Sequence, residues 1–284
     1  MEKSNGPTGS MISRPIPKGG ELLPMIGLGT WQTFDVGNDQ AALENLVAVL
    51  QLFFDGGGKA IDSSPMYGRA EAVVGDLLSK MHAGDRAFLA TKVWTSGRKE
   101  GIGQMRRSAE LLKTRVIDLM QIHNLVDWRT QLATLGKMKE PGQVRYIGIT
   151  HYTPSGFGDL AAIIEREEID FVQLPYSIDQ RDAEKRMLPL AAERGVAVMV
   201  NRPFGGGGLF RKVRGKSLPQ WAAELGCASW AQFFLKYIVS HPAVTCVIPA
   251  TADTAHLSDD LKAGCAPTAD AASRRRMAEF WDAL

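Results

Sequence analysis

The feature that most constrains the fold of this chain is a regular alternation of short apolar runs with longer segments of helical periodicity. Eight runs of strand length follow one another at residues 26–30, 60–63, 88–93, 118–123, 144–150, 170–174, 196–200 and 244–249. The segments between them repeat apolar residues every three or four positions, as Leu46, Val49, Leu50 and Phe53 do within 39–54. Such alternation predicts a parallel sheet, because parallel strands need crossover connections that are usually helical.

Eight strand–helix units predict an α/β fold of the (β/α)8 TIM barrel type, which typically takes roughly 250 residues. The alternative is a doubly wound sheet, whose first strand usually leads into G-x-G-x-x-G; here residues 27–32 read GLGTWQ. Residues 12–25 predict an N-terminal β-hairpin that turns at Lys18, Gly19 and Gly20, and residues 271–284 predict an extra C-terminal helix. We therefore expect one barrel domain over 12–284, preceded by a flexible tail or cloning remnant over 1–11.

The composition argues against several functional classes. A net charge of +2 provides no field for nucleic acid or a membrane surface, and no apolar run reaches the length of a membrane span. Three cysteines without a CxxC motif and five histidines without a metal-ligand spacing predict no disulfide framework and no metal. The cysteine usage favours a reducing, cytoplasmic location, the first ten residues do not read as a signal peptide, and we expect a monomer or weak homo-oligomer.

Polar residues stand at the C-terminal ends of the predicted strands, where barrels of this type place their reactive groups. Asp62, Lys92 and His123 end the second, third and fourth runs, and Tyr67 lies in the loop after Asp62. A free tyrosine has a pKa of roughly 10, which a nearby ammonium lowers, and a carboxylate offsets the cost of burying that ammonium. We therefore expect Asp62 to anchor Lys92 and Lys92 to lower the pKa of Tyr67. His123 would donate a hydrogen bond to a substrate oxygen.

Each of these four residues taken singly is more often structural than catalytic. A strand-end Asp or Lys usually forms a structural ion pair, a loop tyrosine usually packs, and a lone histidine is usually a core residue. Four such residues from three consecutive strands, two of them charged in apolar surroundings, instead favour a catalytic group.

Seven motifs along the chain resemble those of the aldo-keto reductase superfamily in order and spacing. They are GLGTW, AIDSSPMYG, ATKVW, QIHN, GIT, VQLPYS and VIPATADTAHLSDDLKA, and the resemblance extends from about residue 12 to residue 280. It implies that Asp62, Tyr67, Lys92 and His123 form a catalytic tetrad. The implied reaction is NAD(P)H-dependent reduction of an aldehyde or ketone to an alcohol, with Tyr67 as general acid and a small-molecule carbonyl as substrate.

The resemblance also implies a set of cofactor-binding residues, several of which depart from the family pattern. Thr150 and His151 stand where Ser and Asn are usual, and Asn201 stands where an aromatic ring often stacks on the nicotinamide. Ala250 and His256 replace two cations that hold the 2′-phosphate, so NADPH is favoured but NADH is possible. The full implied set is Gly29, Thr30, Trp31, Thr150, His151, Gln173, Asn201, Arg202, Pro203, Phe204, Gly205, Thr251, His256 and Asp260.

The expected substrate pocket is lined by Trp31, Met66, Trp94 and Trp128, whose apolar surfaces suit a flat or hydrophobic carbonyl compound. A short loop over 124–130 and a chain that stops after its last helix predict an open site and broad specificity. Two other functions remain open. One is a cofactor-binding regulatory protein, of the kind that potassium-channel β subunits form on this barrel. The other is a barrel isomerase or hydrolase, which the lack of paired carboxylates or metal ligands disfavours.

Overall fold

The computed structural model describes residues 10–265 and 267–284, and within them eight parallel strands form one sheet in the order of the sequence. This arrangement confirms the predicted barrel. The strands are β3 (Leu28–Gly29), β4 (Ala60–Asp62), β5 (Phe88–Val93), β6 (Ile117–His123), β7 (Val144–Thr150), β8 (Phe171–Pro175), β9 (Ala197–Asn201) and β10 (Val244–Val247).

The two edges of the sheet meet and close it into a barrel. Gly27 N donates to Val247 O over 2.8 Å, and Gly29 N donates to Pro249 O over 2.8 Å. A Cβ on Gly29 would lie 3.0 Å from the carbonyl oxygen of Ile248, closer than most real side chains approach a backbone atom. The glycines of the GLGTW motif therefore allow the first and last strands to come together.

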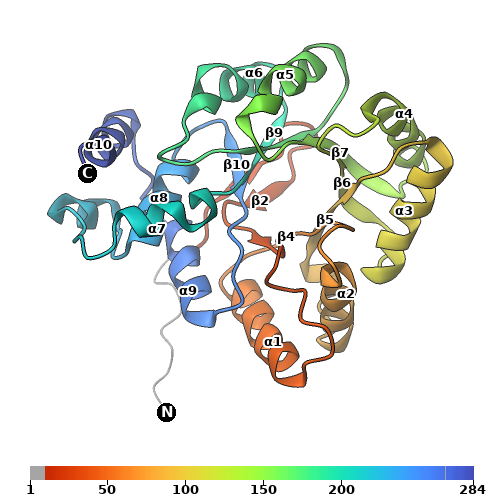
Figure 1. Ribbon diagram of the computed structural model, residues 1–284, viewed down its shortest axis with the longest axis horizontal. Coiled ribbons are helices and arrows are strands. Elements are labelled where there is room, and N and C mark those ends of the chain that lie inside the picture. The colour runs from red at the N-terminus through yellow and green to blue at the C-terminus, as the bar shows by residue number, and fades with distance from the viewer. Residues whose placement is uncertain (1–9, 266) are drawn as a thin grey trace.

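A helix follows each strand and packs on the outside of the barrel (Figure 1). These helices are α1 (Gln40–Asp55), α2 (Ala70–Lys80), α3 (Arg98–Leu111), α4 (Trp128–Lys139), α5 (Phe157–Arg166), α6 (Met187–Glu193), α8 (Trp230–Val239) and α9 (Thr254–Ala263). Two more stand outside the repeat: α7 (Gly208–Lys212), which the sequence analysis did not predict, and the predicted C-terminal helix α10 (Ala271–Asp282). None of the helices in the described part of the chain combines the length and apolar character needed to span a bilayer.

Helix α1 shows how local sequence sets these elements. Asp39 precedes the helix in an extended conformation, and its Oδ1 accepts hydrogen bonds from Ala41 N and Ala42 N over 3.0 and 3.2 Å. This cap satisfies two amides that the helix itself leaves unpaired. The apolar residues that recur at helical spacing form the buried face: Leu46, Val49, Leu50, Phe53 and Phe54.

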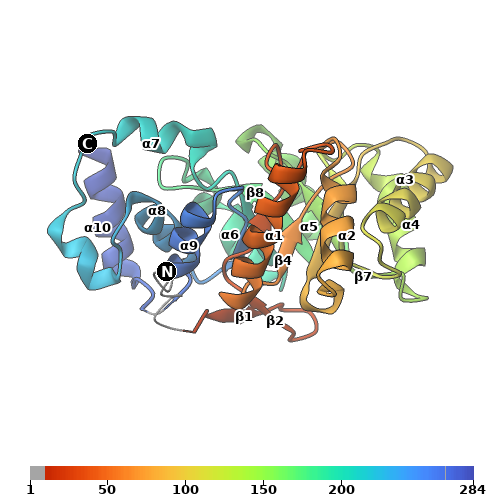
Figure 2. The ribbon, with the colours of Figure 1, turned by 90° about the horizontal axis from the view of Figure 1, so that it is seen from below.

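The N-terminal hairpin, β1 (Ser13–Pro15) and β2 (Leu22–Pro24), is antiparallel and covers one end of the barrel, opposite the end at which α7 lies (Figure 2). Ile16 and Leu23 are buried there in one cluster with Phe88, Tyr146 and Phe171. The interior of this end is therefore filled by apolar side chains. Most of the predicted tail, residues 1–9, lies outside the described residues, whereas Met11 forms a bridge with Cys265.

Candidate active site

The centre of the site is an ion pair buried inside the barrel. Asp62 ends β4 and Lys92 lies on the neighbouring strand β5, with side chains only 2% and 1% exposed. Lys92 Nζ donates to Asp62 Oδ2 over 2.6 Å and to Ser63 O over 2.7 Å. A buried cation is tolerated only when it is paired and hydrogen-bonded in this way. The predicted anchoring of Lys92 by Asp62 is thus present.

Two amide side chains hold the second oxygen of Asp62. Gln121 Nε2 and Gln173 Nε2 donate to Oδ1 over 3.0 and 2.9 Å. Gln173 was predicted only as a cofactor ligand, and the role of Gln121 was not predicted. The strand period could have revealed Gln121, because residues two apart on a strand share a face and Gln121 precedes His123 on β6 by two positions.

Tyr67 reaches the ion pair from a turn between β4 and α2. Tyr67 N donates to Ser64 O over 3.0 Å, and Ala70 N donates to Tyr67 O over 3.1 Å. The Tyr67 ring lies with its centroid 5.1 Å from Lys92 Nζ and 6.3 Å from the centroid of the His123 ring, edge to face. The structure therefore brings together all four residues that the sequence analysis grouped.

Burial and neighbouring charges act in opposite directions on Tyr67 and Lys92. Burial raises the pKa of Tyr67 above its ordinary value; the charge of Lys92 opposes the rise, and that of Asp62 adds to it. The expectation of a pKa lowered overall by Lys92 is therefore wrong in direction, because desolvation of the phenolate outweighs the cation. Burial alone would lower the pKa of Lys92, but Asp62 and Tyr67 outweigh it and raise that pKa.

His123 is an uncharged imidazole. Burial, together with the positive charge of Lys92 and the nearby His151, lowers the pKa of His123 to about 3. Its Nδ1 lies 3.2 Å from the Ser64 hydroxyl, and its ring centroid lies 6.3 Å from that of Trp94. It can therefore donate a single ring proton at neutral pH, but carries no charge there.

Polar residues implied as cofactor ligands extend from the ion pair across β7, β8 and β9. Gln173 Oε1 accepts from Thr150 Oγ1 over 3.2 Å and from Asn201 Nδ2 over 3.4 Å, and Asn201 Nδ2 also donates to His151 O over 3.4 Å. The buried Oδ1 of Asn201 has no hydrogen-bond partner among the described residues. The Oε1 of Gln121, which is joined to Gln173 through Asp62, is likewise buried and without a partner there.

Thr30, directly after β3, has a structural role. Its fully buried hydroxyl donates to Asp62 O over 3.0 Å and accepts from the Ser63 hydroxyl over 3.0 Å. Gly29 closes the barrel seam, as described above, and Trp31 is 52% exposed. Thr30 and Gly29 therefore hold β3 against the strand that carries Asp62, and Trp31 presents its indole to solvent.

The segment after β9 has a backbone that few residues tolerate. Arg202 and the following glycines 205–207 have φ values of 51, 56, 62 and 85°, in the left-handed region that glycine enters at little cost. The Arg202 guanidinium lies 3.4 Å from the point where Gly206 would carry a Cβ. Pro203 is buried, and the Phe204 ring packs on Phe210 with centroids 4.9 Å apart.

Three implied ligands lie at or near α9. Thr251 Oγ1 accepts from Asp253 N over 3.0 Å, and Asp253 caps the helix by accepting from the backbone N–H of the exposed His256. Asp260 lies on the buried face of the helix, where burial and, to a lesser extent, Asp259 raise the pKa of its carboxyl to about 8.

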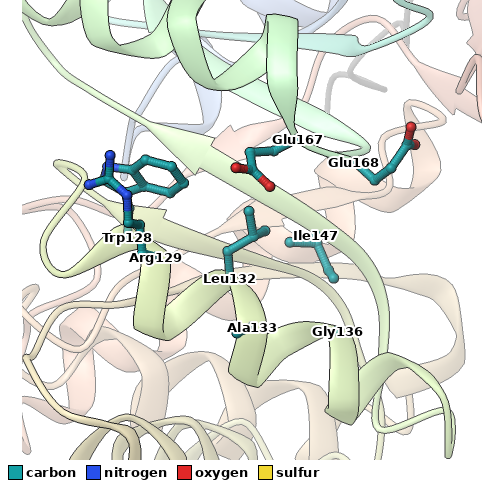
Figure 3. A pocket seen from close by; sticks show the side chains of 8 residues that line it. All are labelled: Trp128, Arg129, Leu132, Ala133, Gly136, Ile147, Glu167 and Glu168. Atoms are coloured by element: carbon teal, nitrogen blue, oxygen red, sulfur yellow. The ribbon is translucent and has the colours of Figure 1, made fainter.

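The proposed pocket residues separate into two groups. Trp31, Met66 and Trp94 are 52%, 42% and 43% exposed, and Trp94 adjoins His123. Trp128, at the start of α4, is less exposed than these three. Its indole lines a pocket of about 270 Å³ between α4 and the α5–β8 connection, together with Leu132 and Glu167 (Figure 3).

The chain is similar to known proteins in both sequence and structure. A model described as the aldo/keto reductase family matches residues 25–281. Methylglyoxal reductase YeaE of Escherichia coli is 27% identical over 245 residues, which cover 84% of each chain. The aldo-keto reductase YhdN of Bacillus subtilis is 27% identical over 194 residues, 62% of this chain and 56% of that one. A crystal structure of an aldo-keto reductase from Klebsiella pneumoniae has the same fold, with a TM-score of 0.79 and 22% identity over 95% of this chain and 96% of its own.

Proposed function

Because this chain belongs to the aldo/keto reductase family and is thereby an NAD(P)-dependent oxidoreductase, we propose that it reduces aldehydes or ketones to alcohols with NADPH. The observation that carries this proposal is the buried 2.6 Å ion pair of Lys92 and Asp62, with the rings of Tyr67 and His123 beside it. A phenol, a fixed cation and a neutral imidazole together supply a proton and two ways to stabilise negative charge on a carbonyl oxygen.

Tyr67 holds the proton that carbonyl reduction requires. Burial keeps its pKa above 10.0, so the phenol is protonated at neutral pH and can donate to the substrate oxygen. The phenolate that remains lies beside Lys92, whose charge lowers its energy. Asp62 keeps Lys92 charged, and the amides of Gln121 and Gln173 keep Asp62 in place.

His123 supports the same oxygen without carrying a charge. With its pKa lowered to about 3, it stays neutral throughout the working range and offers one N–H to the developing alkoxide. Tyr67 and His123 thus have separate roles: one transfers a proton, and the other orients the carbonyl and stabilises its charge.

The residues around the tetrad fit a nicotinamide dinucleotide. The unpaired Oδ1 of Asn201 is an acceptor suited to a carboxamide N–H, and Arg202 with the glycines 205–207 presents a cation and open backbone suited to phosphate oxygens. When bound, the cofactor supplies the hydride. We assign NADPH, the cofactor named for the Klebsiella structure, and NADH is the alternative because Ala250 and His256 provide no fixed cation.

We further propose a wide aromatic mouth and broad specificity. Trp31, Met66 and Trp94 are all more than 40% exposed, so they can rearrange around flat or hydrophobic carbonyl compounds. Trp128 is not part of this proposed mouth, because it lines the pocket beside α4.

The test is an absorbance assay of cofactor oxidation with methylglyoxal, an aromatic aldehyde and a ketone, each with NADPH and with NADH. The Tyr67→Phe variant should lose about 10²–10⁴-fold in kcat, the usual contribution of general acid–base catalysis. Tyr146→Phe is the matched control: it removes the same atom at the opposite end of the barrel, where the hydroxyl donates to Glu21, and should retain kcat.

Two results would contradict the proposal. Wild-type protein that turns over none of the substrates with either cofactor, while binding one of them, would support the regulatory function. Reduction that survives in Tyr67→Phe would remove Tyr67 as the acid.

A further inference from the structure

Ser64 connects the turn that carries Tyr67 to the imidazole of His123. Its side chain is fully buried two residues after Asp62. Its carbonyl oxygen accepts from Tyr67 N over 3.0 Å, and its hydroxyl oxygen lies 3.2 Å from His123 Nδ1. One residue therefore contacts both the turn that carries Tyr67 and the imidazole beside it.

The hydrogen bonds of Ser64 decide which way its proton points. A serine hydroxyl donates once and accepts twice. Ser64 Oγ accepts from Met66 N over 3.4 Å, so this neighbour is a donor and cannot receive the hydroxyl proton. Within residues 10–265 and 267–284, the only acceptor near Ser64 Oγ is His123 Nδ1. If Nδ1 carried the ring proton instead, a buried hydroxyl proton would be left without an acceptor, which is costly.

The protonation of His123 completes the assignment. A neutral imidazole has one N–H and one acceptor nitrogen, and the partner of one nitrogen determines the state of the other. In the described part of the chain, the ring of His123 has no hydrogen-bond partner besides Ser64. No second group therefore competes to set its tautomer.

We propose that Ser64 is a positioning residue that fixes the tautomer of His123: its hydroxyl donates to Nδ1, so Nε2 carries the proton offered to the substrate oxygen. The inference rests on the proposed carbonyl reduction for its consequence, but the tautomer itself is a property of the protein alone. Ser64 touches no reacting atom; it acts through His123 by keeping the donating nitrogen protonated at all times.

The tautomer can be measured directly by NMR of protein labelled with 15N at histidine. Comparison with His123→Gln identifies the His123 signals among the five histidines. In the wild type at neutral pH, Nδ1 should show a pyridine-type shift and Nε2 a pyrrole-type shift. In Ser64→Ala the two shifts should move toward each other as both tautomers become populated, and Ser64→Cys, a weaker donor of similar size, should lie between. Ser63→Ala removes the neighbouring buried hydroxyl, which contacts Thr30 rather than His123, and should keep the wild-type tautomer.

Kinetics provide the second measurement. Ser64→Ala should lower kcat about two- to tenfold, the range that loss of one neutral hydrogen bond produces, and Ser64→Cys should recover part of it.

The proposal is overturned if wild-type Nδ1 carries the proton, or if a folded Ser64→Ala variant keeps a single Nε2–H tautomer. Absence of reductase activity in the wild type would defeat the proposed function and leave the NMR result interpretable. Circular dichroism and unfolding curves check that each variant is folded.

Discussion

At the scale of single residues, burial decides the charge states of Tyr67 and His123 more than neighbouring charges do. Tyr67 and His123 are both neutral at pH 7, for the same reason: each would lose hydration on ionising. Lys92 and Asp62 are buried as ions, and their attraction at 2.6 Å offsets the desolvation of both charges. The reaction therefore begins from a neutral acid and a neutral donor beside one fixed ion pair.

The pH dependence of catalysis follows from these states. With NADPH saturating, kcat/KM for reduction should show no transition from His123 between pH 5 and 8, because its pKa lies near 3. It should fall with rising pH only where Tyr67 loses its proton, above 10.0. Initial rates measured over pH 5–11 test this. An acid limb centred near pH 6.5, or an alkaline limb below pH 9, would contradict it.

Asp260 allows a separate test through stability. Asp260 is only 4% exposed, and burial raises its pKa from an ordinary value of 3.8 to about 8. A carboxyl whose pKa is raised by folding stabilises the protein fully below pH 3.8 and loses that contribution as pH rises toward 8. Wild type should therefore lose stability relative to Asp260→Asn by on the order of 1.4 kcal/mol per pH unit between pH 5.5 and 7.5. Urea unfolding of both proteins measures the difference, and a difference independent of pH would rule out a buried neutral carboxyl.

The grouping of the four site residues could be predicted from the sequence, but the pKa shift of Tyr67 could not. The types and order of Asp62, Tyr67, Lys92 and His123 were sufficient to group them, because parallel strands bring their ends together. The direction of the Tyr67 pKa shift was not predictable in the same way. It depends on how completely the phenol is buried, and no local pattern encodes that. Ser64 and Gln121 were missed because their roles are hydrogen bonds to other side chains.

At the scale of elements, close packing of helices depends on particular glycines. Gly75 lies inside α2, and a Cβ there would be 2.0 Å from the carbonyl oxygen of Leu111 at the end of α3. Gly136 lies inside α4, where a Cβ would meet nothing within 4 Å. Glycine is therefore needed for packing at one site and is merely tolerated at the other.

This contrast predicts opposite effects of one substitution. Gly136→Ala should stabilise the protein by about 0.5–1 kcal/mol, because alanine loses less backbone entropy in a helix. Gly75→Ala gains the same propensity but must displace backbone of α3, and should destabilise by about 1–3 kcal/mol. Thermal or urea unfolding of the two variants measures both signs. Equal stabilisation of both would show that α2 and α3 are not packed as described.

Element boundaries were predicted best for two strands in the interior of the sheet order. The predicted runs 88–93 and 144–150 coincide with β5 and β7. The first predicted strand, 26–30, is reduced to Leu28–Gly29, with Ile26 in an isolated bridge to Val247. Closure of the barrel interrupts regular pairing at this seam, and that constraint comes from the far end of the chain. Helix α7 was missed because it follows a glycine run, which predicts a loop.

At the scale of the whole molecule, the two ends of the barrel have different tasks. The hairpin end is filled by Ile16 and Leu23 with aromatic side chains of three strands. The opposite end holds the buried ion pair and the exposed aromatic residues. Stability and chemistry are therefore spatially separated, which is the usual division in barrels of this type.

Because the two ends are separate, a substitution at the hairpin end should change stability without changing catalysis. Leu23 is 1% exposed within the barrel, whereas its neighbour Leu22 is 58% exposed on the same strand. Leu23→Ala should leave a cavity and lower the free energy of unfolding by about 2–5 kcal/mol. Leu22→Ala should change it by less than about 0.5 kcal/mol, as surface substitutions usually do. Urea unfolding tests both values.

For protein that remains folded at the assay temperature, kcat and KM of Leu23→Ala should equal those of wild type, because the substitution lies at the end of the barrel opposite Tyr67. A Leu23→Ala enzyme that is fully folded but has a reduced kcat would mean that packing at the closed end controls the geometry of the ion pair, and that the two ends are mechanically coupled through the strands.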